Sequence, residues 1–132
     1  MCEILFRGKR VDNGEWVEGF PYITHGGEHQ IRYYDSESNI ENCSHTVIPD
    51  TLGRFTGLTD CNGTKIFEGD VVKFKYFDDW IGKIEYDSDS ALFTVIFADG
   101  DDDYFGRVSC GDCEVIGNIY DNPELMEVSG NE

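Results

Sequence analysis

Short stretches of alternating apolar and polar residues recur along the second half of the chain. Val72, Phe74 and Tyr76 alternate with lysines, which is the period of two expected of a half-buried strand. Residues 91–98 are apolar at almost every position, which is typical of a central strand. Strands are predicted over residues 71–77, 80–86, 91–98, 104–108 and 114–120. Their number and length indicate a small SH3-like barrel.

The first half carries shorter strand signals separated by glycine turns. Strands are predicted over residues 4–7, 15–20, 30–34 and 46–48. Asn13-Gly14 favours a tight hairpin turn between the first two, because both turn positions need positive φ. The polar residues 35–43 are predicted to form a loop.

Helix signals are nearly absent from the sequence. No stretch keeps the apolar period of 3.6 residues for three turns. Pro49 is expected to begin one helical turn through Leu52, and Asn122-Pro123 a second one. We therefore predict a mainly β fold with at most one or two helical turns. It would consist of an N-terminal β-hairpin subdomain, residues 1–50, followed by a small SH3-like barrel or sandwich, residues 51–132.

The net charge of the chain restricts the possible partners more than its hydrophobicity does. The 132 residues include 10 Lys and Arg against 27 Asp and Glu, a formal net charge of −17. Residues 85–132 hold thirteen of the acidic residues and one base, Arg107. A field of this sign opposes nucleic-acid binding by the molecule as a whole. Neither an apolar run of ~20 residues nor a signal peptide is present, so a soluble protein of the cytoplasm is expected, with no membrane partner.

Several blocks of the sequence, in order, resemble the YopX family of small proteins encoded by bacterial phages and prophages. The central block is Phe55-Thr-Gly-Leu-Thr-Asp-Cys-Asn-Gly-Thr-Lys-Ile-Phe-Glu-Gly-Asp-Val-Val72, called the signature segment below. The other blocks are residues 3–9, 14–19, 47–51 and 114–125. The resemblance implies a phage or prophage origin, a β-rich fold, a bacterial cytoplasm and self-association. It carries over no catalytic residue.

The signature segment also has a direct physical interpretation. Gly57, Gly63 and Gly69 recur every six residues and predict tight turns. The apolar pair 66–67 would anchor the segment between those turns, and Asp70 is expected to cap the last one.

Cysteine spacing suggests one metal site as an alternative. Cys110 and Cys113 have the CxxC spacing of half a zinc site, and Cys43, His45 or Cys61 would have to supply the rest. The sequence contains no second CxxC, so we expect no metal and no cofactor. The five cysteines are an odd number, and in a reducing compartment no disulfide framework is expected.

No enzymatic constellation is evident. The serines and three histidines lack a nucleophile-elbow context, and no phosphate-binding loop or dinucleotide fingerprint occurs. We therefore predict a protein that is not an enzyme, with no catalytic or cofactor-binding residues.

Two surfaces suggest alternative partners. Lys73, Lys75 and Lys83 lie near Tyr76 and Trp80, an association of cations and aromatic rings that small barrels use to bind nucleic acid. The simpler interpretation is a solvated outer face opposite the core.

The acidic run at Asp101, Asp102 and Asp103 suggests a surface that imitates a nucleic-acid backbone and inhibits a host nuclease or DNA-binding protein.

The favoured prediction is a phage accessory protein that binds an unknown host or phage protein and forms a homo-oligomer. It is based on the family resemblance, the missing catalytic set and the exposed edges expected of short strands.

Overall fold

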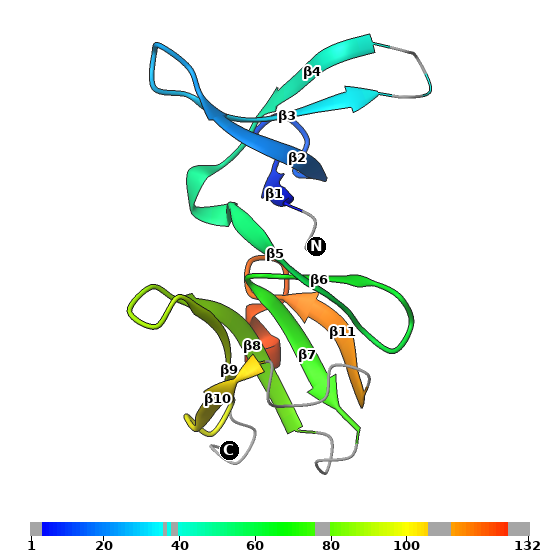
Figure 1. Ribbon diagram of the computed structural model, residues 1–132, viewed down its shortest axis with the longest axis vertical. Helices are drawn as coiled ribbons and strands as arrows, with labels where there is room; N and C mark the ends of the chain where they lie inside the picture. The colour runs from blue at the N-terminus through cyan, green and yellow to red at the C-terminus, as the bar shows by residue number, and fades with distance from the viewer. Residues whose placement is uncertain (1–3, 36, 38–39, 76–79, 106–111, 127–132) are drawn as a thin grey trace. The chain divides into compact units, whose positions relative to one another are not determined.

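The computed structural model describes residues 4–126 except 36, 38–39, 76–79 and 106–111 (Figure 1). The predicted mainly β fold class is confirmed, because these residues form antiparallel strands joined by turns and short 3-10 turns. The chain divides into two compact units, Met1–Phe55 and Thr56–Glu132. Each unit has its own buried residues, so each is described by itself.

The first unit is an antiparallel sheet with the strand order β4-β3-β2-β1. Its strands are β1 (Phe6–Lys9), β2 (Trp16–Ile23), β3 (His29–Asp35) and β4 (Ile40–Thr46). A turn at Asn13-Gly14 joins β1 to β2, as predicted, but only Gly14 of the two has a positive φ, 74°. The Arg10 N–H donates to Glu15 O at 2.8 Å, so the connection is longer than the predicted two-residue turn. The loop predicted over residues 35–43 is wrong in its second half, where β4 begins at Ile40. The sequence of β4 is mostly polar and shows no alternation of apolar and polar residues, so it gave no strand signal. Its backbone nevertheless pairs with β3, as in the pair Tyr33 and Cys43.

This sheet curls strongly, so that Arg10, just after β1, pairs with Val47, just after β4. Among the described residues of the unit, the fully buried apolar side chains are Ile31 and Val47. Gly8 leaves room for Val47, because a Cβ there would lie 3.0 Å from the Val47 Cβ. Gly19 in the same way leaves room for β3, since a Cβ there would lie 2.3 Å from the carbonyl oxygen of Arg32. The interior is therefore narrow, and the large aromatic side chains of β2 lie on the outer face.

The link to the second unit is a 3-10 turn and a strand. The helical turn predicted from Pro49 is confirmed as the 3-10 turn η1 (Pro49–Thr51). The Thr51 hydroxyl accepts the Lys9 N–H at 2.9 Å and donates to the Ile48 carbonyl at 2.6 Å. β5 (Gly53–Thr59) then pairs with β1 through its first residues, Gly53 and Arg54. This pairing keeps residues up to Phe55 in the first unit, whereas the sequence placed the boundary at residue 50.

The second unit contains a five-stranded antiparallel sheet in the order β10-β9-β8-β7-β11. Its elements are β6 (Lys65–Phe67), β7 (Asp70–Phe74), β8 (Trp80–Asp87), β9 (Leu92–Phe97), β10 (Asp102–Tyr104), β11 (Cys113–Asn118) and the 3-10 turn η4 (Pro123–Met126). The last of these confirms the predicted second helical turn. β6 lies beside β5, and neither strand was predicted, since their glycine-rich sequence is typical of turns.

The core of the second unit lies on one face of this sheet. Val72 and Phe74 of β7 are fully buried with Ile84 and Val95 of the central strands, as their alternation predicts. Phe105 is also buried. The strand predicted over residues 104–108 is displaced, because β10 spans Asp102–Tyr104 and ends before Phe105. Residues 106–108 of that predicted strand lie outside the described residues.

Candidate functional site

The signature segment contains two of the three predicted glycine turns. Gly63 and Gly69 lie in turns with φ of 84° and 94°, which confirms these two predictions. Gly57 also has a positive φ, 89°, but it lies inside β5, so the turn predicted there is wrong. A carboxylate oxygen of Asp70 accepts the Phe67 N–H at 2.7 Å, which confirms the predicted cap. Phe67 and Ile66 are buried as the expected apolar anchors.

Asp60 organises the central turn of the signature. Its exposed fraction is 6%. One carboxylate oxygen accepts the backbone N–H groups of Asn62 at 2.8 Å and Thr64 at 2.9 Å. The other accepts the N–H of Val115 at 2.9 Å, 55 residues further along the chain. Burial raises the pKa of Asp60, but the three N–H donors and the charge on Lys75 outweigh it, so the pKa lies below its ordinary value.

The same turn covers the outer edge of β11. The Cys61 N–H donates to the Cys113 carbonyl at 3.0 Å, and Asp60 holds the next outward N–H, that of Val115. At the opposite edge of the sheet, β10 has three residues, of which Asp102 and Asp103 are acidic. A short, charged edge strand resists pairing with another chain. Both outer strands of the five-stranded sheet are therefore protected.

β4 of the first unit is an edge strand of a different kind. The Val47 N–H donates to His29 O at 2.9 Å, and Val11 N–H donates to Thr46 O at 3.0 Å. Hydrogen-bonding directions alternate along an antiparallel strand, so the N–H and C=O of Ser44 point away from β3, as those of Thr46 do. Seven residues long, β4 is last in the strand order of this unit.

The zinc candidates are distributed over both units. Cys43 and His45 lie two residues apart on β4, and His45 Nε2 is 2.8 Å from the Tyr33 hydroxyl. Cys113 is fully buried in the apolar core of the second unit, Cys61 is exposed in the signature turn, and Cys110 lies outside the described residues. No group of three or more His, Cys, Asp or Glu side chains is placed to hold a metal in the described part of the chain. The zinc hypothesis stays a prediction.

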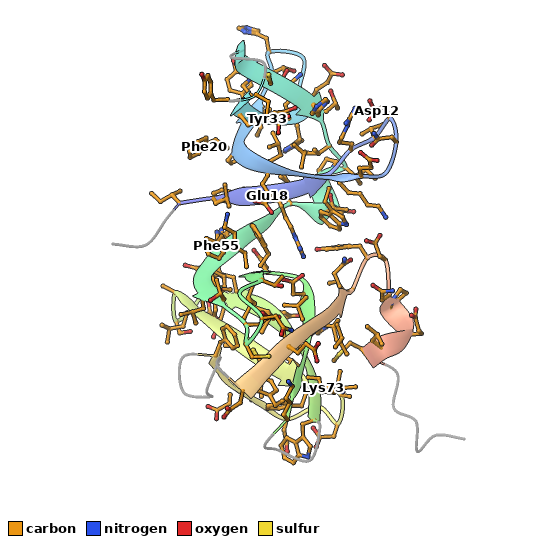
Figure 2. The ribbon with its side chains drawn as sticks, turned by 90° about the vertical axis from the view of Figure 1, so that its right-hand side faces the viewer. Asp12, Glu18, Phe20, Tyr33, Phe55 and Lys73 are labelled. Atoms are coloured by element: carbon orange, nitrogen blue, oxygen red, sulfur yellow. The ribbon has the colours of Figure 1, made fainter. Side chains whose placement is uncertain are left out.

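The structure separates Trp80 from the lysines of the predicted nucleic-acid surface. Trp80 pairs with Phe74 and contacts the Phe97 ring edge-on at 5.1 Å, so it lies on the core side of the sheet. Lys73 and Lys83 lie on the other side, and Lys83 forms an ion pair of 3.0 Å with Glu85 (Figure 2 labels Lys73). Lys75 is exposed beyond β7, while Tyr76 lies outside the described residues. Binding by this surface remains a prediction.

The acidic residues of the other predicted surface border a shallow hollow. Asp101 is exposed in the turn before β10, and Asp102 and Asp103 line an open hollow of about 210 Å³ with Asp87 and Thr94. The arrangement concentrates negative charge on the β10 edge. Mimicry of DNA by this edge also stays a prediction.

Sequence reasoning missed a surface of the first unit, which we call the aromatic–arginine face. It is the outer face of β1, β2 and β3, and consists of Arg7, Trp16, Phe20, Tyr22, Arg32 and Tyr34. The exposed fractions of Phe20, Tyr22 and Tyr34 are 58%, 45% and 54%. Figure 2 shows Phe20 projecting from β2, and Glu18 and Tyr33 on opposite faces of the sheet. The spacing of Trp16, Phe20 and Tyr22 at even positions was the signal that could have revealed this face.

The sequence blocks that resemble a known family lie in both units. They contain β1, the 3-10 turn η1, the signature segment and β11. A family model described as YopX protein matches residues 5–127. The chain belongs to the YopX family. No curated protein matches the sequence significantly. Within the described residues, this YopX-family chain has no helix that is long and apolar enough to span a membrane.

Proposed function

We propose that this YopX-family protein is a phage or prophage accessory protein that acts by binding proteins, including a second copy of itself, and not by catalysis. The proposal places it in the cytoplasm of a bacterial host. The family assignment supports this proposal because YopX is a family of unknown function with no associated enzymatic activity.

The observation that carries the proposal is the open edge of β4. Ser44 is exposed, and its backbone N–H and C=O point outward. An extended segment of another chain adds to such an edge through main-chain hydrogen bonds, and side chains at alternate positions provide specificity. The two outer strands of the five-stranded sheet are covered or acidic, and β6, at the other end of the sheet that contains β4, has only three residues. The seven-residue β4 is therefore the favoured edge among the described strands.

Exposed apolar side chains around the first unit support a protein partner. Ile4, Val11 and Ile48 have exposed fractions of 72%, 60% and 40%. Val11 and Ile48 lie close together, since the N–H groups of both bond across the junction between the end of β1 and the end of β4. Apolar side chains beside an open edge add buried area to a strand-pairing interface.

The test is a proline at the outward position of β4. Ser44→Pro removes an N–H that β3 does not use, so the first unit keeps its ladder while the edge loses a donor. Light scattering on the size-exclusion eluate is expected to show an oligomer for the unmodified protein and for Ser44→Ala, and a monomer for Ser44→Pro. A monomer for all three proteins at high concentration would contradict self-association. An oligomer that survives Ser44→Pro unchanged would exclude the β4 edge as its interface.

A further inference from the structure

The aromatic–arginine face combines exposed rings with cations on one curved surface. Phe20 and Tyr22 are two residues apart on β2, which places their Cα atoms ~7 Å apart along the strand. Arg32 of β3 pairs with Phe20, and its guanidinium carbon lies 3.6 Å from the centroid of the Tyr22 ring. Arg7 of β1 covers the Trp16 ring in the same manner, at 4.5 Å.

Charge on this face is opposite in sign to that of the whole chain. Lys9 pairs with Trp16 and Arg7 with Glu18, so Arg7, Lys9 and Arg32 share the face with one carboxylate of these strands, Glu18. The other acidic residues of the first unit that the structure describes lie outside β1 and β2, and in β3 only at its last residue: Asp12, Glu15, Glu28, Asp35, Glu37, Glu41 and Asp50. Residues 1–55 carry nine acidic and five basic side chains, a net of −4, and residues 56–132 carry the other −13. The face is therefore a local cationic surface on an acidic chain.

The Arg32 guanidinium has no strong hydrogen-bond partner among the described residues. Its Nε is buried without a hydrogen-bond partner, and its Nη2 has a long contact of 3.4 Å with Gln30. No carboxylate pairs with it among the described residues. Stacking on Tyr22 holds the guanidinium plane in place, so ordering it for a ligand costs little side-chain entropy.

We infer that the aromatic–arginine face binds single-stranded nucleic acid. Unstacked bases have two free π faces, which stack on Phe20, Tyr22 and Tyr34. Phosphates between the bases meet Arg7, Lys9 and Arg32. A duplex offers no unstacked base, so it gains only the phosphate contacts. An acidic peptide would use the cations but would leave the exposed rings without comparable partners.

The net charge sets the character of this binding. The whole chain repels phosphates, so stacking and not electrostatic attraction must supply most of the free energy. With three cations on the face, the logarithm of the association constant should fall with the logarithm of salt concentration at a slope of about −2. This slope corresponds to ~15-fold weaker binding at 200 mM than at 50 mM salt.

The experiment is fluorescence anisotropy of labelled 12-nucleotide oligothymidine and oligouridine at ~50 mM salt, a low concentration that favours binding. Phe20→Ala and Tyr22→Ala should each weaken binding about 5- to 100-fold, because one base loses its stacking partner. Ile23→Ala is the matched control on the opposite face of β2, equally exposed at 61%, and should bind like the unmodified protein. A duplex of the same length should bind at least ~10-fold more weakly.

Four results would overturn the inference. One is no binding of either oligonucleotide, and a second is equal loss for Ile23→Ala and Phe20→Ala. A third is a loss for Trp80→Ala with none for Phe20→Ala, which would move the site to the second unit. The last is displacement of the oligonucleotide by an oligoglutamate peptide of the same length at equal concentration, which would assign the face to acidic protein segments.

Discussion

At the scale of single residues, Asp60 connects two distant parts of the second unit. Its two carboxylate oxygens accept three backbone N–H groups, two in the signature turn and one on β11. Hydrogen bonds to an ionised acceptor are stronger than neutral ones, with a net contribution of ~1.5–3 kcal/mol each. The residue therefore ties the turn to the edge strand that it covers.

Asp60→Asn is expected to destabilise the protein by about 2–3 kcal/mol at pH 7, because an amide NH2 would face an N–H donor at one of these positions. Urea unfolding followed by tryptophan fluorescence measures the change. Asp89→Asn, at an exposed position in the β8–β9 turn, is the matched control and should change stability by less than ~0.5 kcal/mol. A loss for Asp60→Asn as small as that of the control would contradict this role.

The pH dependence follows from the lowered pKa of Asp60. The folded pKa lies below the unfolded value of ~3.9, so its stabilising contribution is complete above that value and is lost as pH falls through the folded pKa. The stability difference between the unmodified protein and Asp60→Asn should therefore be constant from pH 7 to about pH 5 and shrink toward pH 3. A difference that grows on acidification would show that the carboxylate is not stabilised as an anion.

At the scale of elements, the signature glycines do not have equal roles. Gly63 lies in an open turn, where a Cβ would meet nothing within 4 Å. Gly69 sits between two strands: its N–H donates to Ile84 O at 2.8 Å, and its carbonyl accepts from Ile119 N–H at 2.9 Å. A Cβ on Gly69 would lie 3.0 Å from Cε2 of Tyr120.

Both Gly63→Ala and Gly69→Ala place a side chain at positive φ, which costs ~1–2 kcal/mol. Gly69→Ala should cost at least ~1 kcal/mol more, because the Tyr120 ring must also move. Thermal unfolding of the two variants beside the unmodified protein checks this order. Equal melting temperatures for Gly63→Ala and Gly69→Ala would mean that the Tyr120 ring moves aside without a loss of stability, which would contradict this prediction.

The elements also show what a sequence can predict. β7 and β8 were predicted because Val72, Phe74 and Ile84 alternate with charged residues, although β7 ends at Phe74 and not at residue 77. β9 was predicted from its continuous apolar run. β4 was missed because an edge strand needs backbone pairing but few buried side chains. Trp80 and Lys83 are close in sequence, yet successive side chains of a strand alternate between faces. The aromatic–arginine face is assembled from three strands, and only their register brings Arg32 over Tyr22.

At the scale of the molecule, each unit has its own buried residues. Ile31 and Val47 are buried in the first unit, and Phe74, Ile84 and Val95 in the second. Each unit combines local hairpins with one long-range pairing. In the first unit β1 meets β5, as in the pair Phe6 and Arg54, and in the second β7 meets β11, as in the pair Val72 and Val115.

Core truncations should therefore act on one unit at a time. Ile31→Ala should lower the stability of residues 1–55 by ~2–5 kcal/mol, and Phe74→Ala that of residues 56–132 by ~3–5 kcal/mol. Hydrogen exchange read by mass spectrometry should show lost protection confined to peptides of the unit that carries the change. Leu92→Ala, at a half-exposed position, should change the protection of neither unit. Loss of protection throughout the chain for either truncation would mean that the two units unfold as one.

The pairing of β7 with β11 has a consequence for synthesis on the ribosome. All strand partners of the first unit have been translated by residue 54, so it is able to fold early. β7 must wait for a neighbour that begins 39 residues after Phe74, which takes a few seconds at about 5–20 residues per second. During that interval Val72 and Phe74 lack one covering strand, and the nascent chain is most exposed to chaperones, proteases and aggregation.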